Sequence, residues 1–246
     1  MDATRRIAFV AGLLFVITFI TSIPALLLFD PVINDADYIV GPGADNQIFT
    51  GAFLELVLII ANIGTALVLF PVLKRQSEIF ALGFVAARIV ECVFIAIGVL
   101  SVLSVVTLRH DFAGVANSDS AALTVVGGSL VAIKDWTFLF GPGFVVGIGN
   151  GFLLGYLMYR SGLVPRRMAM LGLIGGPLVC ASGIAVMYGV FELGSVGQFI
   201  ATIPEILWEA SLGIWLLVKG FNASPIISGY SRDVGHDTDA SLAMAD

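Results

Sequence analysis

Residues 48–70 read IFTGAFLELVLIIANIGTALVLF, a continuous apolar run in which Glu55 is the only ionisable residue. A helix that crosses a membrane needs about 20 consecutive, mainly apolar residues. The run meets this length and holds no proline, so it predicts a membrane-spanning helix. Its two most polar members, Glu55 and Asn62, lie seven residues apart and therefore on one face of that helix.

Five further segments have the same character, and the composition of the whole chain agrees with them. Hydrophobic residues make up 58% of the chain and charged residues only 12%, whereas a soluble domain carries about 25% charged residues. We therefore predict an all-α fold, a polytopic transmembrane helical bundle formed by residues 1–221 as a single domain. The six predicted spans are 7–29, 48–70, 79–106, 136–159, 168–191 and 198–218.

Two segments outside these spans have predictions of their own. Residues 121–133 are moderately apolar but too short to cross a membrane, which predicts a short extra interfacial or re-entrant helix before the fourth span. Residues 222–246 are polar and rich in Ser, Gly and Asp. This composition predicts a disordered tail, which lies on the cytoplasmic side in the orientation derived next.

Basic residues gather at alternate connections between the spans. Connections rich in Lys and Arg stay in the cytoplasm, so both termini of the chain are predicted to be cytoplasmic. The formal net charge of −6 argues against a nucleic-acid partner, which needs a basic face, and leaves the lipid bilayer as the expected surrounding. The basic residues on the predicted cytoplasmic side are Arg5, Arg6, Lys74, Arg75, Arg160, Arg166, Arg167 and Lys219.

Ionisable and amide side chains lie deep within the predicted spans. A charge at the centre of a bilayer costs roughly 2.5–3.5 kcal/mol on insertion scales, so such residues face a partner, the bundle interior or water. Helix geometry places Arg88, Glu91 and Glu209 near the mid-plane, with Glu55 and Glu205 nearer the outer surface. The predicted intramembrane polar cluster consists of Glu55, Asn62, Arg88, Glu91, Asn150, Glu205 and Glu209.

The charges of this cluster do not balance. Four acids stand against Arg88 alone, so full ionisation would leave three uncompensated negative charges. Repulsion and desolvation favour neutral carboxyl groups, which means that some glutamates hold protons or that a cation lies among them. Oxygen ligands suit a hard cation such as Na⁺ or Ca²⁺, and Glu91 with Glu209 is the candidate cation site. The alternative is a buried structural network around Arg88.

Lys134, Asp135 and Trp136 stand at the predicted outer end of the fourth span. Tryptophan is typical of the headgroup level of a membrane, which favours an interfacial anchor. The second interpretation makes Lys134 and Asp135 outer access residues for the polar cluster.

A glycine stripe occupies the fourth span, where glycine recurs every four residues. Glycines on one stripe allow a neighbouring helix to approach closely. Packing within the chain is the favoured interpretation, and a homodimer through the stripe is the alternative. The stripe consists of Gly143, Gly147, Gly151 and Gly155.

Several kinds of chemistry lack their sequence signatures. The chain has neither G-x-S-x-G nor H-E-x-x-H, and no catalytic residue is assigned. His110 and His236 both lie away from the membrane centre, which argues against a haem held by two histidines. Cys92 and Cys180 lack metal or redox spacing and are interpreted as packing residues. No cofactor is predicted apart from the candidate cation, and no resident metal is assigned.

Five stretches carry a resemblance to a known family: LFPVLKR at 69–75, AARIVE at 86–91, LFGPG at 139–143, LMYRSGLVPR at 157–166 and LWEASLGIWLLVKGF at 207–221. Together they resemble a family of bacterial multi-pass integral-membrane proteins, classed as a domain of unknown function, with six or seven helices. The resemblance implies a location in the bacterial cytoplasmic (inner) membrane and supplies no activity. The family pattern has His where this chain has Lys134.

The leading functional hypothesis is a membrane protein that binds or moves a proton, a cation or a small polar solute at the acidic cluster. In it, Glu91 and Glu209 exchange the ligand, while Glu55 and Glu205 line the outer access route. The first alternative is a non-catalytic membrane scaffold or accessory subunit held by the glycine stripe. The second is a lipid-accessible membrane enzyme that uses a glutamate as acid or base.

Overall fold

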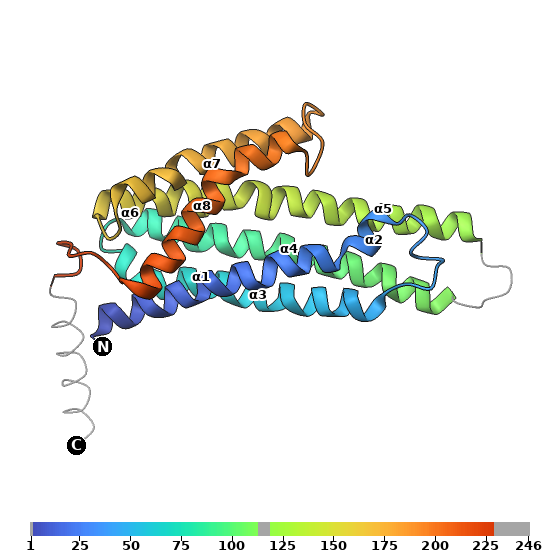
Figure 1. Ribbon diagram of the computed structural model, residues 1–246, viewed down its shortest axis with the longest axis horizontal. Coiled ribbons are helices and arrows are strands. Elements are labelled where there is room, and N and C mark those ends of the chain that lie inside the picture. The colour runs from blue at the N-terminus through green and yellow to red at the C-terminus, as the bar shows by residue number, and fades with distance from the viewer. Residues whose placement is uncertain (1, 113–118, 229–246) are drawn as a thin grey trace, which may run out of the picture.

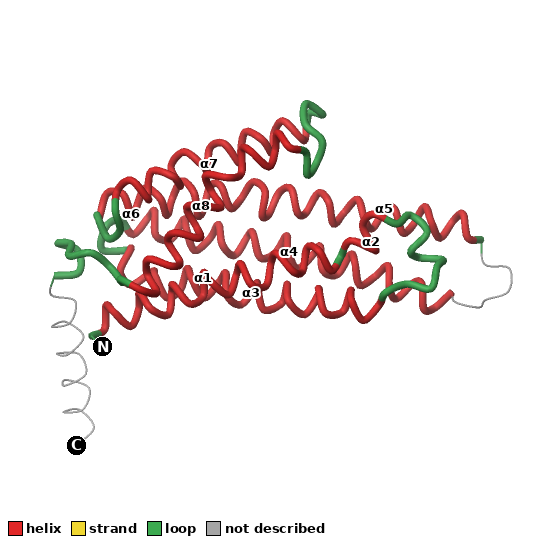
Figure 2. Tube along the Cα trace, in the orientation of Figure 1, coloured by secondary structure: helices red, strands yellow, loops and turns green. Residues whose placement is uncertain are grey.

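The computed structural model describes residues 2–112 and 119–228, and this part of the chain consists of helices joined by short loops, without β-strands (Figure 1 and Figure 2). Six helices are long and apolar enough to cross a membrane, as the sequence predicted. They are α1 (Ala3–Leu28), α3 (Asp45–Leu73), α4 (Glu78–Phe112), the continuous helix from Ser120 to Ser161, α7 (Arg166–Met187) and α8 (Val196–Val218). A short helix, α2 (Asp30–Asn34), follows α1.

Local capping sets the ends of these helices, which differ from the predicted spans by a few residues. The side chain of Asp2 accepts a hydrogen bond from the backbone N–H of Arg5 at 2.6 Å and starts α1. Ser195 caps α8 in the same way through the N–H of Gln198. The helix α7 stops at Met187, before Gly189 with its φ of +72°. Such a left-handed residue ends a helix, and glycine adopts it without a steric penalty.

The fourth span differs from the prediction because it is one long helix. It begins as α5 (Ser120–Phe140), widens into the π-helical stretches η1 (Gly141–Val145) and η2 (Gly147–Leu154), and ends as α6 (Gly155–Ser161). Residues 121–133 therefore form the first part of α5, and the separate interfacial or re-entrant helix is not seen. Asp119 caps α5, and the next residue that disrupts a helix is Pro142. Proline lacks the N–H that an α-helical turn requires, and here the helix widens instead of ending.

The glycine stripe packs against α7 of the same chain. A Cβ atom on Gly147 would lie 2.6 Å from the carbonyl oxygen of Gly176, and one on Gly151 would lie 2.4 Å from the Cα atom of Gly176. Backbones that approach this closely need glycine on both sides. The centre of the stripe is thus filled by α7, so the surface predicted for a homodimer is not free.

Two apolar core clusters lie at opposite ends of the bundle. The first contains Phe15, Phe84 and Trp208, all fully buried, and lies towards the start of α1. The second contains Phe29 and Val102 and lies towards the far end. Between these two clusters, α1, α3 and α4 carry buried polar residues: Thr18, Thr21, Asn62, Thr65, Arg88 and Glu91.

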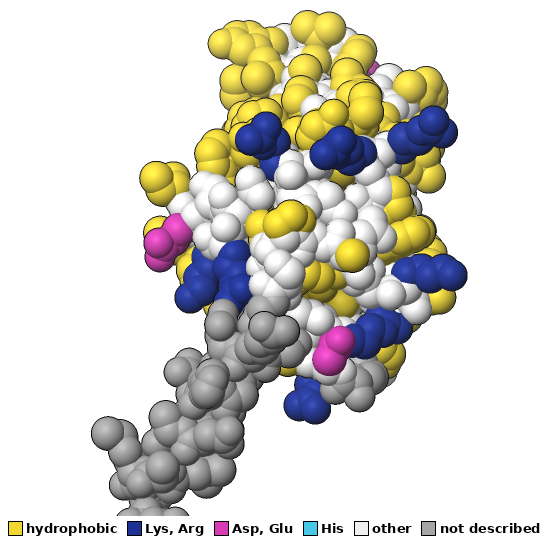
Figure 3. Space-filling view, turned by 90° about the vertical axis from the view of Figure 1, so that its left-hand side faces the viewer, with side chains coloured by type: hydrophobic (Ala, Val, Ile, Leu, Met, Phe, Trp, Pro, Cys, Tyr) yellow, Lys and Arg dark blue, Asp and Glu magenta, His cyan; other side chains and the backbone are white. Residues whose placement is uncertain are grey.

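Basic side chains surround the end of the molecule where α1 begins (Figure 3). This end holds the start of α1, the end of α8, and the α3–α4 and α6–α7 turns. Arg5 donates hydrogen bonds to the carbonyl oxygens of Leu216 and Leu217 at 2.9 Å and of Val218 at 3.0 Å. A cation suits these positions because the carbonyl groups at a helix C-terminus lack helical partners.

The opposite end is formed by α2, the connection to α3, and the ends of α4 and α5, which reach beyond the α7–α8 turn (Figure 1). The carboxylate of Asp45 contacts Nη1 of Arg109 and Nε2 of His110 at 2.5 Å each, and accepts a hydrogen bond from the hydroxyl of Tyr38 at 2.7 Å. Burial and then the contact with Asp45 raise the pKa of the Tyr38 phenol. These contacts hold the α2–α3 connection against α4.

The segment after α8 returns to the basic end. The N–H of Asn222 donates to the carbonyl oxygen of Leu163 at 2.8 Å, and the hydroxyl of Ser224 donates to that of Ser161 at 2.6 Å. Ile226 and Ile227 pack against the first core cluster. The disordered tail was predicted to begin at residue 222, but the structure gives its first residues defined contacts. Its remainder, 229–246, lies outside the described residues.

Candidate functional site

A cavity of about 170 Å³ lies between the two core clusters, and α1, α3, α4, α8 and the fourth span all contribute to its wall. Of the seven residues predicted for the polar cluster, six line it, and they come from three different helices. Asn150 does not line the cavity itself, but its side chain contacts Glu209, which does. The six lining residues are Glu55, Asn62, Arg88, Glu91, Glu205 and Glu209.

Arg88 stands at the centre of this site and is almost fully buried. Its Nη1 atom donates to Oε2 of Glu91 at 2.8 Å, and its Nη2 atom lies 3.8 Å from Oε1 of Glu209. The rings of Phe15 and Phe84 lie 5.7 and 5.9 Å from the guanidinium carbon. The guanidinium thus contacts both acids of the predicted cation site, Glu91 and Glu209.

Glu91 has both of its carboxylate oxygens occupied. Oε2 accepts from Arg88, and Oε1 accepts from Nδ2 of Asn62 on α3 at 3.1 Å. Hydrogen bonds between ionised partners, such as that between Arg88 and Glu91, are stronger than bonds between neutral groups. This geometry makes Glu91 part of the fixed framework of the site, in contrast to the exchange role predicted for it.

Glu209 is held through the π-helical part of the fourth span. The side-chain amide of Asn150, on η2, donates a hydrogen bond to Oε1 of Glu209. The indole N–H of Trp208 donates to the backbone carbonyl oxygen of the same Asn150 at 2.9 Å. Two consecutive residues of α8, Trp208 and Glu209, are therefore hydrogen-bonded to Asn150 of η2. Such π-helical turns are frequent at functional sites.

Glu205 differs from the other acids because it has no partner. Its side chain is 3% exposed, and neither carboxylate oxygen has a hydrogen-bond partner within the described residues. Its Oε2 atom rests on two glycines: a Cβ on Gly151 would lie 2.6 Å from it, and one on Gly175 would lie 2.9 Å away. The site therefore holds a buried carboxyl group on bare backbone, beside the cavity, with its hydrogen-bonding capacity unused.

Glu55 forms a buried ion pair at the end of the cavity nearer the second core cluster. The Nζ atom of Lys134 donates to its two carboxylate oxygens at 2.7 and 2.9 Å. Lys134 is only 4% exposed, and its ammonium group lies 4.7 Å from the centre of the Phe29 ring. Lys134 is thus no interfacial anchor. It is a buried counter-charge.

Asp135 is not part of the cavity wall. Together with Trp136 it lines a separate hollow of about 280 Å³ against the α7–α8 turn. The predicted pair of outer access residues is thus divided, with Lys134 directed inward and Asp135 directed to another surface.

Sequence reasoning missed two members of the site, Lys134 as an ion-pair partner and Trp208 as a donor. Lys134 lies within an unbroken helix that begins at Ser120, whereas the predicted span began only at residue 136 and left Lys134 outside it. Trp208 directly precedes Glu209 in the sequence, but no pattern reveals that its N–H meets the carbonyl of Asn150.

Lys134 also changes the charge balance. Four carboxyl groups now face two cations, Arg88 and Lys134, so full ionisation leaves two uncompensated negative charges instead of the predicted three. Within residues 2–112 and 119–228, no group of three or more His, Cys, Asp and Glu side chains is arranged to hold a metal ion. The excess of acid remains the chemical character of the site, and it falls on Glu205 and Glu209.

Comparison with known proteins places the chain in a family without naming an activity. No curated protein matches the sequence, and no solved structure matches it. A scan against protein-family models matches residues 10–220 to one family, and this range covers all six spans nearly completely. The chain therefore belongs to the family described as "Domain of unknown function (DUF4386)".

Proposed function

We propose that this multi-pass membrane protein binds and exchanges a proton or a small cation at Glu205 and Glu209, inside the cavity between its helices. The observation that supports this most directly is the state of Glu205, a buried carboxyl group without any partner beside a cavity. The excess of two acids over bases in the same site supports it further.

The energetics of burial give Glu205 two stable states. Removing an ionised carboxylate from water costs several kcal/mol even after relaxation of the protein, and Glu205 has no donor or cation to offset this cost. The group is therefore stable when it carries a proton or when a cation lies beside it. A group that is stable only in these two states exchanges one for the other, which is the chemistry of proton-coupled binding.

The remaining polar residues have supporting roles in this proposal. Arg88 and Asn62 fix Glu91, and Arg88 provides the counter-charge that limits how many acids ionise together. Glu209 contacts Asn150 on one side and lies 3.8 Å from Arg88 on the other. It is also the least buried of the acids in the cavity wall, with 18% of its side chain exposed, so we assign it the exchange step.

Proteoliposomes with an internal pH-sensitive dye test this proposal. An imposed proton or cation gradient is expected to change the internal pH faster with the native protein than in protein-free vesicles. Glu205→Gln and Glu209→Gln should abolish this difference, because glutamine fills the same space but neither binds a proton nor carries a charge. Glu192→Gln, at an exposed acid of the α7–α8 turn, is the control and should behave as native. Native rates in both cavity variants would refute the proposal.

We also propose that the chain lies in a bacterial cytoplasmic membrane with its basic end in the cytoplasm. Basic connections remain on the cytoplasmic side during insertion, and the Lys and Arg residues gather at the end where α1 begins and α8 ends (Figure 3). In this orientation the cavity extends from the mid-plane towards the outer leaflet.

A further inference from the structure

Buried side chains lie at both ends of the cavity. At its outer end, the Lys134–Glu55 ion pair and the fully buried ring of Phe29 lie across it. At its basic end, α1 and α8 cross so closely that a Cβ on Gly12 would lie 2.4 Å from the backbone nitrogen of Leu217. Below this crossing lies the dry first core cluster.

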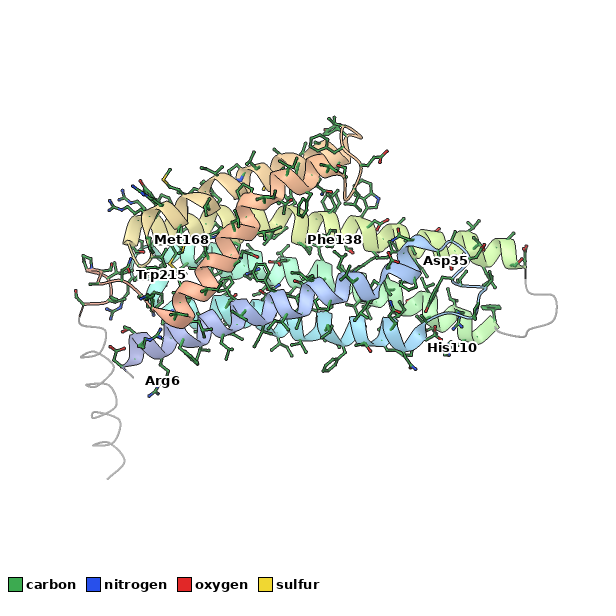
Figure 4. The ribbon with its side chains drawn as sticks, in the orientation of Figure 1. Arg6, Asp35, His110, Phe138, Met168 and Trp215 are labelled. Atoms are coloured by element: carbon green, nitrogen blue, oxygen red, sulfur yellow. The ribbon has the colours of Figure 1, made fainter. Side chains whose placement is uncertain are left out.

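The cavity opens sideways, between α1 and α8. Beyond their crossing the two helices separate, because α8 leans away towards α7 (Figure 1). Leu26 on α1 and Ile206 on α8 both line the cavity, and they are 47% and 37% exposed on the outer surface of the bundle. Phe138, which lines the cavity too, lies on α5 in the gap between α8 and α1 in Figure 4. We call this opening, lined by Leu26, Phe138 and Ile206, the α1–α8 gap.

A second hollow adjoins the cavity at the helix crossing. It measures about 200 Å³, and its wall is apolar except for Glu209, which also lines the cavity. Phe19 is shared by the two spaces as well. A membrane surrounds the exposed apolar side chains of spanning helices, so both openings face lipid. Glu209 therefore lies between the cavity and the bilayer.

We propose that the ligand of this site is an alkylammonium amphiphile, which enters from the bilayer through the α1–α8 gap and places its cationic head beside Glu205 and Glu209. This proposal rests on the proposed function, since it requires the same two carboxyl groups to exchange a proton for a cation. It adds the class of the ligand and the direction from which it comes.

The size of the cavity supports a head-sized guest. A cavity of about 150 Å³ takes up benzene in a well-studied case, whereas sites for drug-sized molecules measure about 300–1,000 Å³. The present cavity of about 170 Å³ accommodates a small ammonium head but not a whole lipid. The alkyl chain stays between the exposed side chains of Leu26 and Ile206, in contact with the bilayer.

The charge of the site selects a cation over an anion. Arg88 pairs with Glu91 and lies 3.8 Å from Glu209, and Lys134 pairs with Glu55, so the charge of each base is already balanced by an acid. The two acids beyond this balance face the cavity. An ammonium group that replaces the proton of Glu205 leaves the net charge of the site unchanged, while an anion would add to its negative charge.

Carbodiimide labelling of the full chain in nanodiscs tests both the route and the ligand. Carbodiimides react with protonated carboxyl groups, and peptide mass spectrometry locates the product. Lipid-soluble dicyclohexylcarbodiimide is expected to label Glu205 or Glu209, whereas a water-soluble carbodiimide at the same concentration should leave both unlabelled. Ile206→Trp and Leu26→Trp narrow the gap from opposite walls, and either should reduce labelling to the level of the Glu205→Gln, Glu209→Gln double variant.

Leu207→Trp is the matched control, because Leu207 is exposed on the same helix but does not line the cavity. It should label as the native chain does. A native elution volume in gel filtration shows that each tryptophan variant is folded. If only one gap variant folds, its labelling alone decides the outcome.

The ligand class is tested by protection. Decyltrimethylammonium should protect the site from dicyclohexylcarbodiimide, while tetramethylammonium, decanol and decyl sulfate at equal concentration should not. Equal protection by decanol or decyl sulfate overturns the cationic ligand, and protection by tetramethylammonium overturns the need for an alkyl chain. Equal labelling by both carbodiimides overturns lateral entry but leaves the proposed function intact. Absence of labelling by either reagent over the accessible pH range contradicts the proposed function itself.

Discussion

Arg88 holds the buried acids of this protein in fixed positions, because one guanidinium contacts carboxylates from two helices. It pairs with Glu91 on its own helix and approaches Glu209 on α8. Its Nε atom has no hydrogen-bond partner in the described structure. The contacts with Glu91 and Glu209 therefore offset the cost of burying its charge.

Replacing Arg88 by Met should destabilise the protein by about 3–5 kcal/mol, since removal of one member of a buried ion pair leaves the other uncompensated. The change should appear as a lower midpoint of thermal unfolding in detergent, followed by loss of the monodisperse gel-filtration peak. The double variant Arg88→Met, Glu91→Met removes both charges and should regain part of this loss. An unchanged midpoint in the single variant would contradict the buried pair.

Glu91 and Glu205 should respond in opposite ways to the same substitution by glutamine. Glu91→Gln breaks the 2.8 Å contact with Arg88 and should lower the unfolding midpoint, because a bond to a charged group contributes about 1.5–3 kcal/mol. Glu205→Gln breaks no bond within the described residues and should leave the midpoint unchanged or higher. Equal losses in the two variants would show that Glu205 has a partner in the folded protein.

The sequence predicts which residues form this site but not how they pair. Helix periodicity alone brings Glu55, Arg88 and Glu205 to facing stripes, and in the structure all three line the same cavity. The partners depend on the rotation of each helix and on side-chain reach, which no spacing rule provides. Lys134 illustrates this, because its long side chain reaches Glu55 from a helix that the prediction began two residues later.

At the scale of whole elements, the contact between η2 and α7 sets the shape of the bundle. Gly147, Gly151 and Gly176 let the two backbones touch, and the same approach places Gly151 and Gly175 under the carboxyl group of Glu205. A tight helix pair thus provides the floor of the site. The packing interpretation of the glycine stripe accounts for its spacing without a second copy of the chain.

Gly176→Ala tests this contact. Its Cβ would lie 2.3 Å from the carbonyl oxygen of Gly147, so α7 must move away, and overpacking of this kind costs about 1–3 kcal/mol. The unfolding midpoint should fall. Gly128→Ala is the matched control, because its Cβ meets nothing within 4 Å and alanine favours a helix over glycine by up to about 1 kcal/mol. The structure predicts a loss at one glycine and none at the other.

The length of the fourth helix could not be predicted from hydrophobicity. Residues 121–133 are too short for a span, and they are followed by Gly141 and Pro142, residue types that disfavour a regular α-helix. The structure keeps the helix continuous by widening its turns at that point. Whether a Gly-Pro pair ends a helix or widens it depends on the tertiary contacts around it, here with α4 and α7.

At the scale of the whole molecule, the ring of basic side chains gives the bundle an orientation. Two exposed glutamates at opposite ends suit replacement by a single cysteine. They are Glu78, in the first turn of α4, and Glu192, in the α7–α8 turn. In a chain whose native Cys92 and Cys180 are replaced by Ala, a membrane-impermeant maleimide should label Glu192→Cys in intact cells. It should label Glu78→Cys only after the membrane is opened.

The reverse pattern would place the basic end outside and invert the proposed direction of the cavity. Labelling of both positions in intact cells would mean that the preparation is leaky or that the orientation is mixed, and a cytoplasmic marker enzyme distinguishes these cases. The number and order of the spans were predictable at this scale, because each depends on composition alone.

The continuous helix from Ser120 to Ser161 has a mechanical consequence. It carries Lys134, which holds Glu55 at one end of the cavity, and Asn150, which holds Glu209 at the other. The π-helical stretch η1 and the start of η2 lie between them, and each residue of an α-helix turns the chain by about 100°. If those wide turns tightened into α-helix, Lys134 and Asn150 would rotate relative to each other about the helix axis. A change in these turns would therefore affect the Lys134–Glu55 ion pair and the contact between Asn150 and Glu209 together.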